Sequence, residues 1–164
     1  MLCVTGHRPS GLPWGYNEND PRLSALQNRM RETLLRCVSG GVTHCITGMA
    51  QGVDTWFAEL VLAYCPGVAL TAAVPFAGQE KRWPAADQRQ YHSILDRCTQ
   101  VRVLAPWYNP RALLFRNEWM VDHSGQVMAV WDGSSGGTAH TVRYAQSLER
   151  VIHYLPPWDE EEVP

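Results

Sequence analysis

The sequence has no surplus of positive charge. Its 14 Lys and Arg residues face 16 Asp and Glu residues, which leaves a formal net charge of -2. Proteins that hold a nucleic-acid backbone usually present a basic surface, because much of their affinity comes from neutralised phosphates. We therefore do not expect nucleic acid as a partner, although a local basic patch is compatible with this charge balance.

The sequence also has no apolar run of the roughly 18 residues that a membrane-spanning helix needs. Its opening, MLCVTGHRP, does not place a charged region before a long apolar stretch, as a secretory signal does. The hydrophobic fraction of 45% is enough to build the core of one domain from 164 residues. These features predict a soluble, cytoplasmic protein with no membrane partner.

Paired cysteines are missing as well. The cysteines are odd in number, show no CxxC pair, and fall within predicted strands or helices. The histidines show no metal-ligand spacing with one another or with cysteine. The sequence thus predicts buried, reduced thiols and no metal site. The cysteines are Cys3, Cys37, Cys45, Cys65 and Cys98.

A recognisable catalytic set is absent too. The sequence has no GxSxG motif, no cysteine with an obvious base, and no pair of carboxylates directed at one loop. Whether the protein is an enzyme is left open by these residues. They favour binding over chemistry.

What the sequence does contain is a regular alternation of strand-length apolar runs and helical patterns. The helical pattern is clearest at 53–64, where apolar residues recur three and four positions apart. The alternation predicts an α/β protein, a single Rossmann-like doubly wound domain over residues 1–155. Its mainly parallel sheet should have about five or six strands with helices on both faces. The expected strands are 2–5, 43–47, 68–74, 101–104, 126–131 and 150–155.

Several local features refine this prediction. The almost unbroken apolar run at 68–74 is expected to be a central strand. Asp20 before Pro21, and Asn109 before Pro110, each predict a helix start with a capping side chain and a proline at the first position. The last segment, 156–164, reads PPWDEEEVP and is predicted to be a mobile acidic tail outside the domain.

Four loops follow predicted strands, at 6–8, 48–54, 75–83 and 132–138. Ligands of doubly wound sheets bind at the carboxyl ends of the strands. We therefore expect these loops to meet in one site.

The loop at 132–138 offers the strongest mechanism for binding an anion. It connects a strand to a helix, so unpaired N–H groups and the positive end of the helix dipole meet there. Its glycines permit close approach of a ligand, and its hydroxyls can bond phosphate oxygens. An ordinary tight turn would explain the same residues equally well. The candidate residues are Asp132, Gly133, Ser134, Ser135, Gly136, Gly137 and Thr138.

The other loops add weaker candidates. The turn GMAQG, with Gly48 and Gly52, precedes a helix whose Asp54 either favours the helix dipole or accepts a bond from a sugar or base. An arginine just after the first strand suits the recognition of a phosphate or carboxylate. The simpler alternative is that this arginine and the histidine before it belong to a surface loop that binds no ligand. An arginine and asparagine early in a later helix either reach the site or pair with a neighbouring acid. These further candidates are Gly6, His7, Arg8, Arg116 and Asn117.

With these motifs in view, the chain resembles the YpsA-like branch of the SLOG superfamily. The matching motifs are TGHRP at 5–9, GMAQGVD at 48–54, PF at 75, RNEWMV at 116–121 and WDGSSGGT at 131–138. They keep the family's order and spacing from residue 1 to about 155. The resemblance implies a Rossmann-like fold and a nucleotide or nucleotide-derived ligand.

Two related families are also similar to this chain. The DprA family of DNA-processing proteins shares the GxAxGxD turn, an RN segment and a serine- and glycine-bearing loop, which would imply single-stranded DNA. The LOG-type phosphoribohydrolases share an arginine that corresponds to Arg116, and their glycine-rich PGGxGTxxE loop corresponds to a loop that reads SSGGTAHT here. Thr141 stands where their acidic residue would be. Without that carboxylate, cleavage of an N-glycosidic bond lacks its expected acid or base.

The leading hypothesis is therefore a cytoplasmic protein that binds a nucleotide or nucleotide-derived ligand in a sensing or regulatory role. The alternative is a hydrolase of a nucleotide N-glycosidic bond that recruits Glu118 or Asp54 as its acid. A second alternative is a module that handles single-stranded DNA. The residues name no cofactor and no specific ligand. The aromatic side chains Trp14, Trp83, Trp107 and Tyr108 either form the interface of a homo-oligomer or equally well cover loops.

Overall fold

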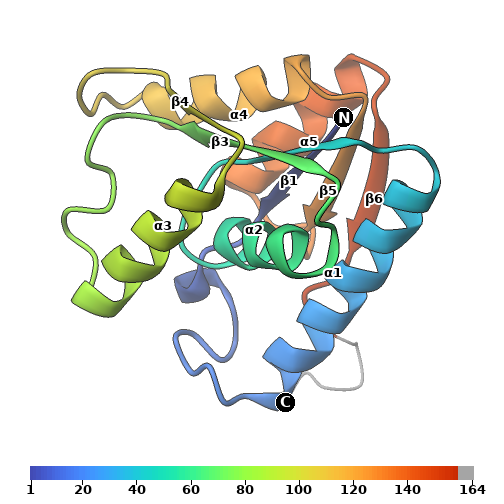
Figure 1. The fold of residues 1–164 in the computed structure, drawn as a ribbon, viewed down its shortest axis with the longest axis horizontal. Coiled ribbons are helices and arrows are strands. Elements are labelled where there is room, and N and C mark those ends of the chain that lie inside the picture. The colour runs from blue at the N-terminus through green and yellow to red at the C-terminus, as the bar shows by residue number, and fades with distance from the viewer. Residues whose placement is uncertain (159–164) are drawn as a thin grey trace.

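A computed structural model of the chain describes residues 1–158 and contains one six-stranded sheet in which all pairs of neighbouring strands are parallel. The strand order is β4-β3-β2-β1-β5-β6 (Figure 1). This Rossmann-like α/β arrangement confirms the predicted fold class. The strands are β1 (Leu2–Gly6), β2 (His44–Thr47), β3 (Ala69–Val74), β4 (Gln100–Val103), β5 (Gln126–Val130) and β6 (Val151–Leu155).

Five α-helices and one short 3-10 helix connect the strands. Helices α1, α2 and α3 share a buried apolar cluster with one face of the sheet, and α4 and α5 share another cluster with the opposite face. The sheet is therefore covered on both sides, as a parallel sheet requires. The helices are η1 (Pro9–Gly11), α1 (Pro21–Ser39), α2 (Val53–Tyr64), α3 (Ala85–Arg97), α4 (Ala112–Asp122) and α5 (Gly137–Ser147).

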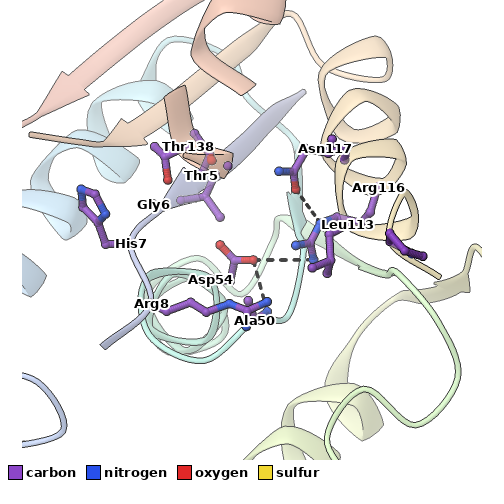
Figure 2. A pocket seen from close by; sticks show the side chains of 14 residues that line it. Thr5, Gly6, His7, Arg8, Ala50, Asp54, Leu113, Arg116, Asn117 and Thr138 are labelled. Atoms are coloured by element: carbon purple, nitrogen blue, oxygen red, sulfur yellow. Dashed lines mark hydrogen bonds and ion pairs between the residues drawn. The ribbon is translucent and has the colours of Figure 1, made fainter. Parts of the chain in front are cut away.

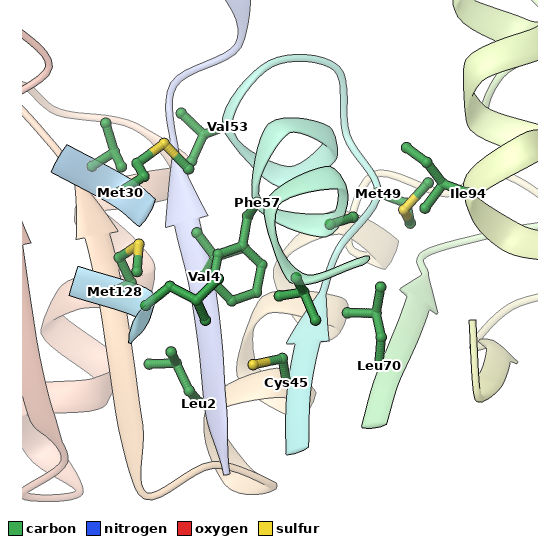
Figure 3. Packing of buried hydrophobic residues seen from close by; sticks show 14 of the residues in the cluster. Leu2, Val4, Met30, Cys45, Met49, Val53, Phe57, Leu70, Ile94 and Met128 are labelled. Atoms are coloured by element: carbon green, nitrogen blue, oxygen red, sulfur yellow. The ribbon is translucent and has the colours of Figure 1, made fainter. Parts of the chain in front are cut away.

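Alternate residues of β1 enter the two clusters. Leu2 and Val4 face α2, where the fully buried ring of Phe57 packs beside Val4 (Figure 3). Cys3 faces the other way and joins the cluster with Met120 of α4. The continuous apolar run of β1 is thus the pattern of a strand buried on both faces.

The apolar run at 68–74 forms an interior strand that is buried on both faces, as expected, but this strand does not lie at the middle of the sheet. β3 lies second from the β4 edge, and β1 lies in the interior between β2 and β5. In a doubly wound sheet the chain starts inside, builds outward to one edge, and then returns to build the other half. An apolar run shows that a strand is buried on both faces, but not how many strands separate it from the edge.

One of the two predicted helix starts is confirmed. Asp20 caps α1, because its Oδ1 accepts from the N–H of Arg22 at 3.0 Å. Asn109 instead closes a turn, in which its Oδ1 accepts from the N–H of Arg111 at 3.0 Å. α4 therefore begins only at Ala112.

Side-chain exposure corrects two further expectations. Trp14 is only 6% exposed and packs into the core, with the guanidinium of Arg22 5.6 Å from its ring, so it is not available for an interface. Trp107 and Tyr108 are exposed, and self-association through them stays a prediction. Cys65 and Cys98 follow the ends of α2 and α3 instead of lying within them, and all five thiols are free.

Two other features concern the chain as a whole. None of the helices within residues 1–158 is long and apolar enough to cross a membrane. Pro156 and Pro157, at the start of the segment predicted to be a tail, accept bonds through their carbonyl oxygens from Arg29 of α1 at 3.2 and 3.1 Å. The acidic part of that segment, 159–164, lies outside the described residues.

Candidate functional site

A cavity of about 430 Å³ opens at the carboxyl end of β1. β1 pairs with β2 on one side and with β5 on the other, so this is where the strand order reverses. The loops after β1 and β5 diverge there toward opposite faces of the sheet, and such a point is the usual ligand site of doubly wound folds. We call it the β1 cavity. Its lining residues are Val4, Thr5, Gly6, His7, Arg8, Ala50, Asp54, Pro110, Leu113, Leu114, Arg116, Asn117, Gly137 and Thr138.

A buried ion pair forms one wall of the β1 cavity (Figure 2). Arg116 comes from α4 and Asp54 from α2, which cover opposite faces of the sheet, and only 5% and 6% of these residues are exposed. The Nη1 of Arg116 lies 3.9 Å from Oδ2 of Asp54 and donates to the carbonyl of Gly48. Its Nε donates to Oδ1 of Asn117 at 2.7 Å. The guanidinium is therefore oriented by three partners.

Burial dominates the electrostatics of this pair. It raises the pKa of the Asp54 carboxyl, while the charge of Arg116, the N–H of Ala50 and the charge of Arg8 act in the opposite direction. Burial also lowers the pKa of Arg116, and Asp54 opposes that shift. A carboxyl with a raised pKa on a cavity wall is typical of functional sites, although structural ion pairs produce the same shift.

Gly48 makes room for this ion pair. A Cβ at this position would lie 2.7 Å from Oδ2 of Asp54 and would also overlap the guanidinium of Arg116. The next residue, Met49, is fully buried and has a φ of 58°, a left-handed conformation that few side chains adopt. The turn after β2 is therefore shaped for Arg116, and it contributes Ala50 to the lining of the cavity.

Gly52 holds the loops after β1 and β2 together. Its φ is 90°, and a Cβ there would lie 2.9 Å from both the carbonyl oxygen of His7 and Cδ of Pro9. Gly6 has a similar packing role, because a Cβ would lie 2.7 Å from Cβ of Val53. Both glycines allow α2 to approach the end of β1 closely.

The opposite wall is the amino end of α5. Gly136 begins this helix with a φ of 139°, and no side chain of the described chain caps it. Gly137 and Thr138, in the first helical turn, line the β1 cavity. The first N–H groups of a helix lack partners inside the helix, so they are available to a ligand. The exposed Arg8 lies on the same cavity (Figure 2).

A bond joins the loop after β1, whose His7 lines the β1 cavity, to the loop after β5. The Nε2 of His7 lies 3.0 Å from Oδ1 of Asp132, which also accepts from the N–H and Oγ of Ser134 at 2.9 and 2.6 Å. Burial acts to raise the pKa of Asp132, but the bonds from Ser134 and the charge of His7 outweigh it and lower that pKa. Asp132 thus joins the loops after β1 and β5 and fixes the shape of its own loop.

The sequence as a whole matches a known family. A family model for YpsA, described as the YspA SLOG family, matches residues 2–154. The chain belongs to the YpsA family. It is 26% identical to a UPF0398 protein of Bacillus thuringiensis over 161 residues, which cover 94% of this chain and 86% of that protein. It is 24% identical to a UPF0398 protein of Halalkalibacterium halodurans over 143 residues, or 84% of this chain and 75% of the relative.

Two solved structures share the fold of this YpsA family chain. DNA processing protein A, or DprA, from Streptococcus pneumoniae superposes with a TM-score of 0.63 and 16% identity, covering 94% of this chain and 50% of DprA. The protein of the same name from Helicobacter pylori superposes with a TM-score of 0.63 and 17% identity, covering 94% of this chain and 64% of that protein. The chain therefore spans between half and two thirds of these proteins' length.

The Helicobacter pylori structure is described as showing a single-stranded DNA binding mode. At this identity the likeness establishes the fold alone.

The structure brings eight of the 15 predicted site residues of this YpsA family chain to the β1 cavity. They are Gly6, His7, Arg8, Asp54, Arg116, Asn117, Gly137 and Thr138. The lining does not include the other seven, which are Gly48, Gly52, Asp132, Gly133, Ser134, Ser135 and Gly136.

Two expectations about other segments were wrong. The loop at 75–83 does not line the β1 cavity, and its Trp83 lines a second cavity instead. Glu118 lies outside the β1 cavity and pairs with His140 at 2.8 Å. The sequence reasoning also missed Leu113 and Leu114 of α4. The spacing of Leu113 with Arg116 and Asn117, three and four positions later, would have placed it on the same helix face.

Proposed function

We propose that the β1 cavity binds a phosphate-bearing, nucleotide-type ligand. The observation that carries the proposal is the placement of the uncapped amino end of α5 and the side chain of Arg8 on one cavity. Unpaired N–H groups, a positive helix end and a guanidinium are together the usual recognition set for phosphate.

The charged lining supports an anionic ligand. Arg8 and Arg116 supply two positive charges against the single carboxylate of Asp54. Because Arg116 is already bound to Gly48 and Asn117, Arg8 is the more available partner for a phosphate.

The remaining lining can accommodate the rest of a nucleotide. Pro110, Leu113 and Leu114 form an apolar wall that suits a base. Asn117 and Asp54 offer polar groups to sugar hydroxyls. The volume of about 430 Å³ lies within the range of small-molecule sites.

Isothermal calorimetry with AMP, ADP-ribose, NAD and cyclic nucleotides tests the proposal, with adenosine as the control that lacks phosphate. We expect at least one phosphate-bearing compound to bind and adenosine to bind more weakly. Absence of binding across the panel at millimolar concentration would refute the proposal.

A hydrolase of a nucleotide N-glycosidic bond is the second candidate, and the raised pKa of Asp54 in the cavity favours it. Release of free base from the nucleotide panel would support turnover. Asp54→Asn should then abolish it, whereas Glu118→Gln should not, because Glu118 lies outside the cavity.

Handling of single-stranded DNA is the third candidate, favoured by the shared fold with DprA. Phosphate contacts make such binding strongly salt-dependent. Gel shifts with an oligonucleotide over a salt series would reveal it, and absence of a shift at low salt would exclude it.

A further inference from the structure

A second cavity, of about 350 Å³, lies on the far side of the contact between Gly52 and Pro9. It is bounded by the segment before α1, the beginning of α2 and the beginning of α3. It shares no lining residue with the β1 cavity. We call it the tryptophan cavity.

Three aromatic residues contribute to its lining. Tyr16, Trp56 and Trp83 come from three separate segments and line the same space. Trp83 is held edge-on by Tyr91 at a centroid distance of 5.4 Å, and its carbonyl accepts from Nε2 of Gln88 at 2.9 Å. The electron-rich faces of tryptophan and tyrosine attract cations.

The charges in the lining have only one sign. Glu18 and Asp87 line the cavity, and none of its lining residues, all within the described part of the chain, is Arg or Lys. This is the opposite of the β1 cavity, where Arg8 and Arg116 are present. A phosphate-bearing ligand is therefore disfavoured here.

The amide side chains in the lining strengthen this bias. The Nε2 of Gln51 donates to Asp87, and the Nε2 of Gln90 donates to Oε1 of Glu59 at 2.8 Å. Their oxygens remain to accept bonds. The cavity thus offers carboxylate and amide acceptors together with aromatic faces, which matches a ligand that is both cationic and rich in donors.

We propose that the tryptophan cavity binds a small organic cation, an alkylammonium or alkylguanidinium compound. The cationic head lies against Trp56 and Trp83 and is neutralised by Asp87 and Glu18. The proposal is independent of the function proposed for the β1 cavity.

Nuclear magnetic resonance of the indole N–H signals gives a local test. The chain contains seven tryptophans, and Trp56→Phe and Trp83→Phe identify the two signals of interest. Titration with n-butylammonium and with n-butylguanidinium should shift these two signals in a saturable way. The neutral n-pentanol and the anionic butanoate should leave them in place.

Asp87→Asn keeps the shape of the cavity and removes one charge. We expect this variant to bind n-butylammonium about fivefold more weakly, which corresponds to the upper end of the contribution of a partly exposed ion pair. Asp96→Asn is the matched control, because Asp96 is exposed on the same helix and does not line the cavity. It should leave the affinity unchanged.

Three results would overturn the proposal. They are equal binding of n-pentanol and n-butylammonium, no saturable shift at millimolar cation, or equal loss of affinity in the Asp87 and Asp96 variants. None of them bears on nucleotide binding, which is measured in the other cavity.

Discussion

Arg116 and Asp54 approach from helices on opposite faces of the sheet and meet beyond the carboxyl end of β2, with Nη1 and Oδ2 3.9 Å apart. The pair joins the two helical layers at the wall of the β1 cavity. Because the pair is buried at the cavity wall, we expect the side chains of Arg116 and Asp54 to affect both the stability of the fold and the binding of a ligand.

Removing the positive member of this pair should destabilise the fold. Arg116→Met leaves the buried carboxyl of Asp54 without its cation and the carbonyl of Gly48 without its donor, so we expect a loss of about 3 kcal/mol in the free energy of unfolding. Urea denaturation measures it. Arg143→Met, at an exposed position of α5, is the control and should change stability little. A loss equal to that of the control would contradict the structural role of Arg116.

The double variant Asp54→Asn with Arg116→Met should recover part of the loss, because no uncompensated charge remains buried. Non-additivity between the single and double variants reports the coupling of the two residues. Strict additivity would mean that the two side chains do not interact in solution.

A side chain at position 48 should also be poorly tolerated. Gly48→Ala places a Cβ 2.7 Å from Oδ2 of Asp54 and against the guanidinium, so the pair must shift, and overpacking of this kind costs about 1–3 kcal/mol. Thermal or urea unfolding checks the change. Gly67→Ala is the matched control, since nothing lies within 4 Å of a Cβ there. Equal stability of the two variants would show that the turn after β2 is more adaptable than the structure indicates.

The bonds that Asp132 accepts from Ser134, together with the charge of His7, predict a dependence of stability on pH. The pKa of Asp132 is lowered from its ordinary value of 3.8, so its carboxylate stabilises the folded state above that pH. This contribution is lost as the pH falls through the lower pKa of the folded state. Wild type should therefore exceed Asp132→Asn in stability at pH 7 and at pH 5, and the difference should shrink below about pH 4.

Unfolding curves at several pH values give this comparison. Asp96→Asn, at an exposed position, serves as the reference for loss of one carboxylate. If the difference in stability between wild type and Asp132→Asn stayed the same at low pH, the effect would come from the shape of the Asp132 side chain and not from its charge.

Arg8 should matter for binding more than for folding. Arg8→Gln removes an exposed guanidinium from the β1 cavity, and we expect nucleotide affinity to fall about tenfold, the loss of a charge-assisted bond. Calorimetry with the tightest member of the nucleotide panel measures it. The control is Arg143→Gln, which also removes one positive charge but lies on α5 outside the cavity. This variant should keep the nucleotide affinity of the wild type. Parallel losses in both variants would point to a general charge effect.

Local patterns were sufficient for the architecture. The alternation of apolar runs and helical spacing predicted a parallel sheet covered on both faces, and Asp20 with Pro21 predicted the start of α1. These features depend on residues within one or two turns of each other. The position of β3 could not be read in this way, because burial on both faces is common to all interior strands.

The candidate site was predictable only as a set of loops. The rule that ligands bind at the carboxyl ends of strands brought Arg8, Asp54 and Thr138 to the same edge of the sheet. It did not separate residues that line the cavity from residues that shape it, such as Gly48 and Asp132.

The sequence by itself determined the order of strands and helices, the glycines of the connecting turns and the family to which the chain belongs. The tertiary structure decided which side chains meet, because those contacts join residues far apart in the chain. His7 and Asp132 are 125 positions apart, and Arg116 and Gly48 are 68 apart. The tertiary structure also placed the loop that holds Trp83 at a second cavity. The position of that loop depends on the packing of α3 against α2, which no local sequence pattern indicates.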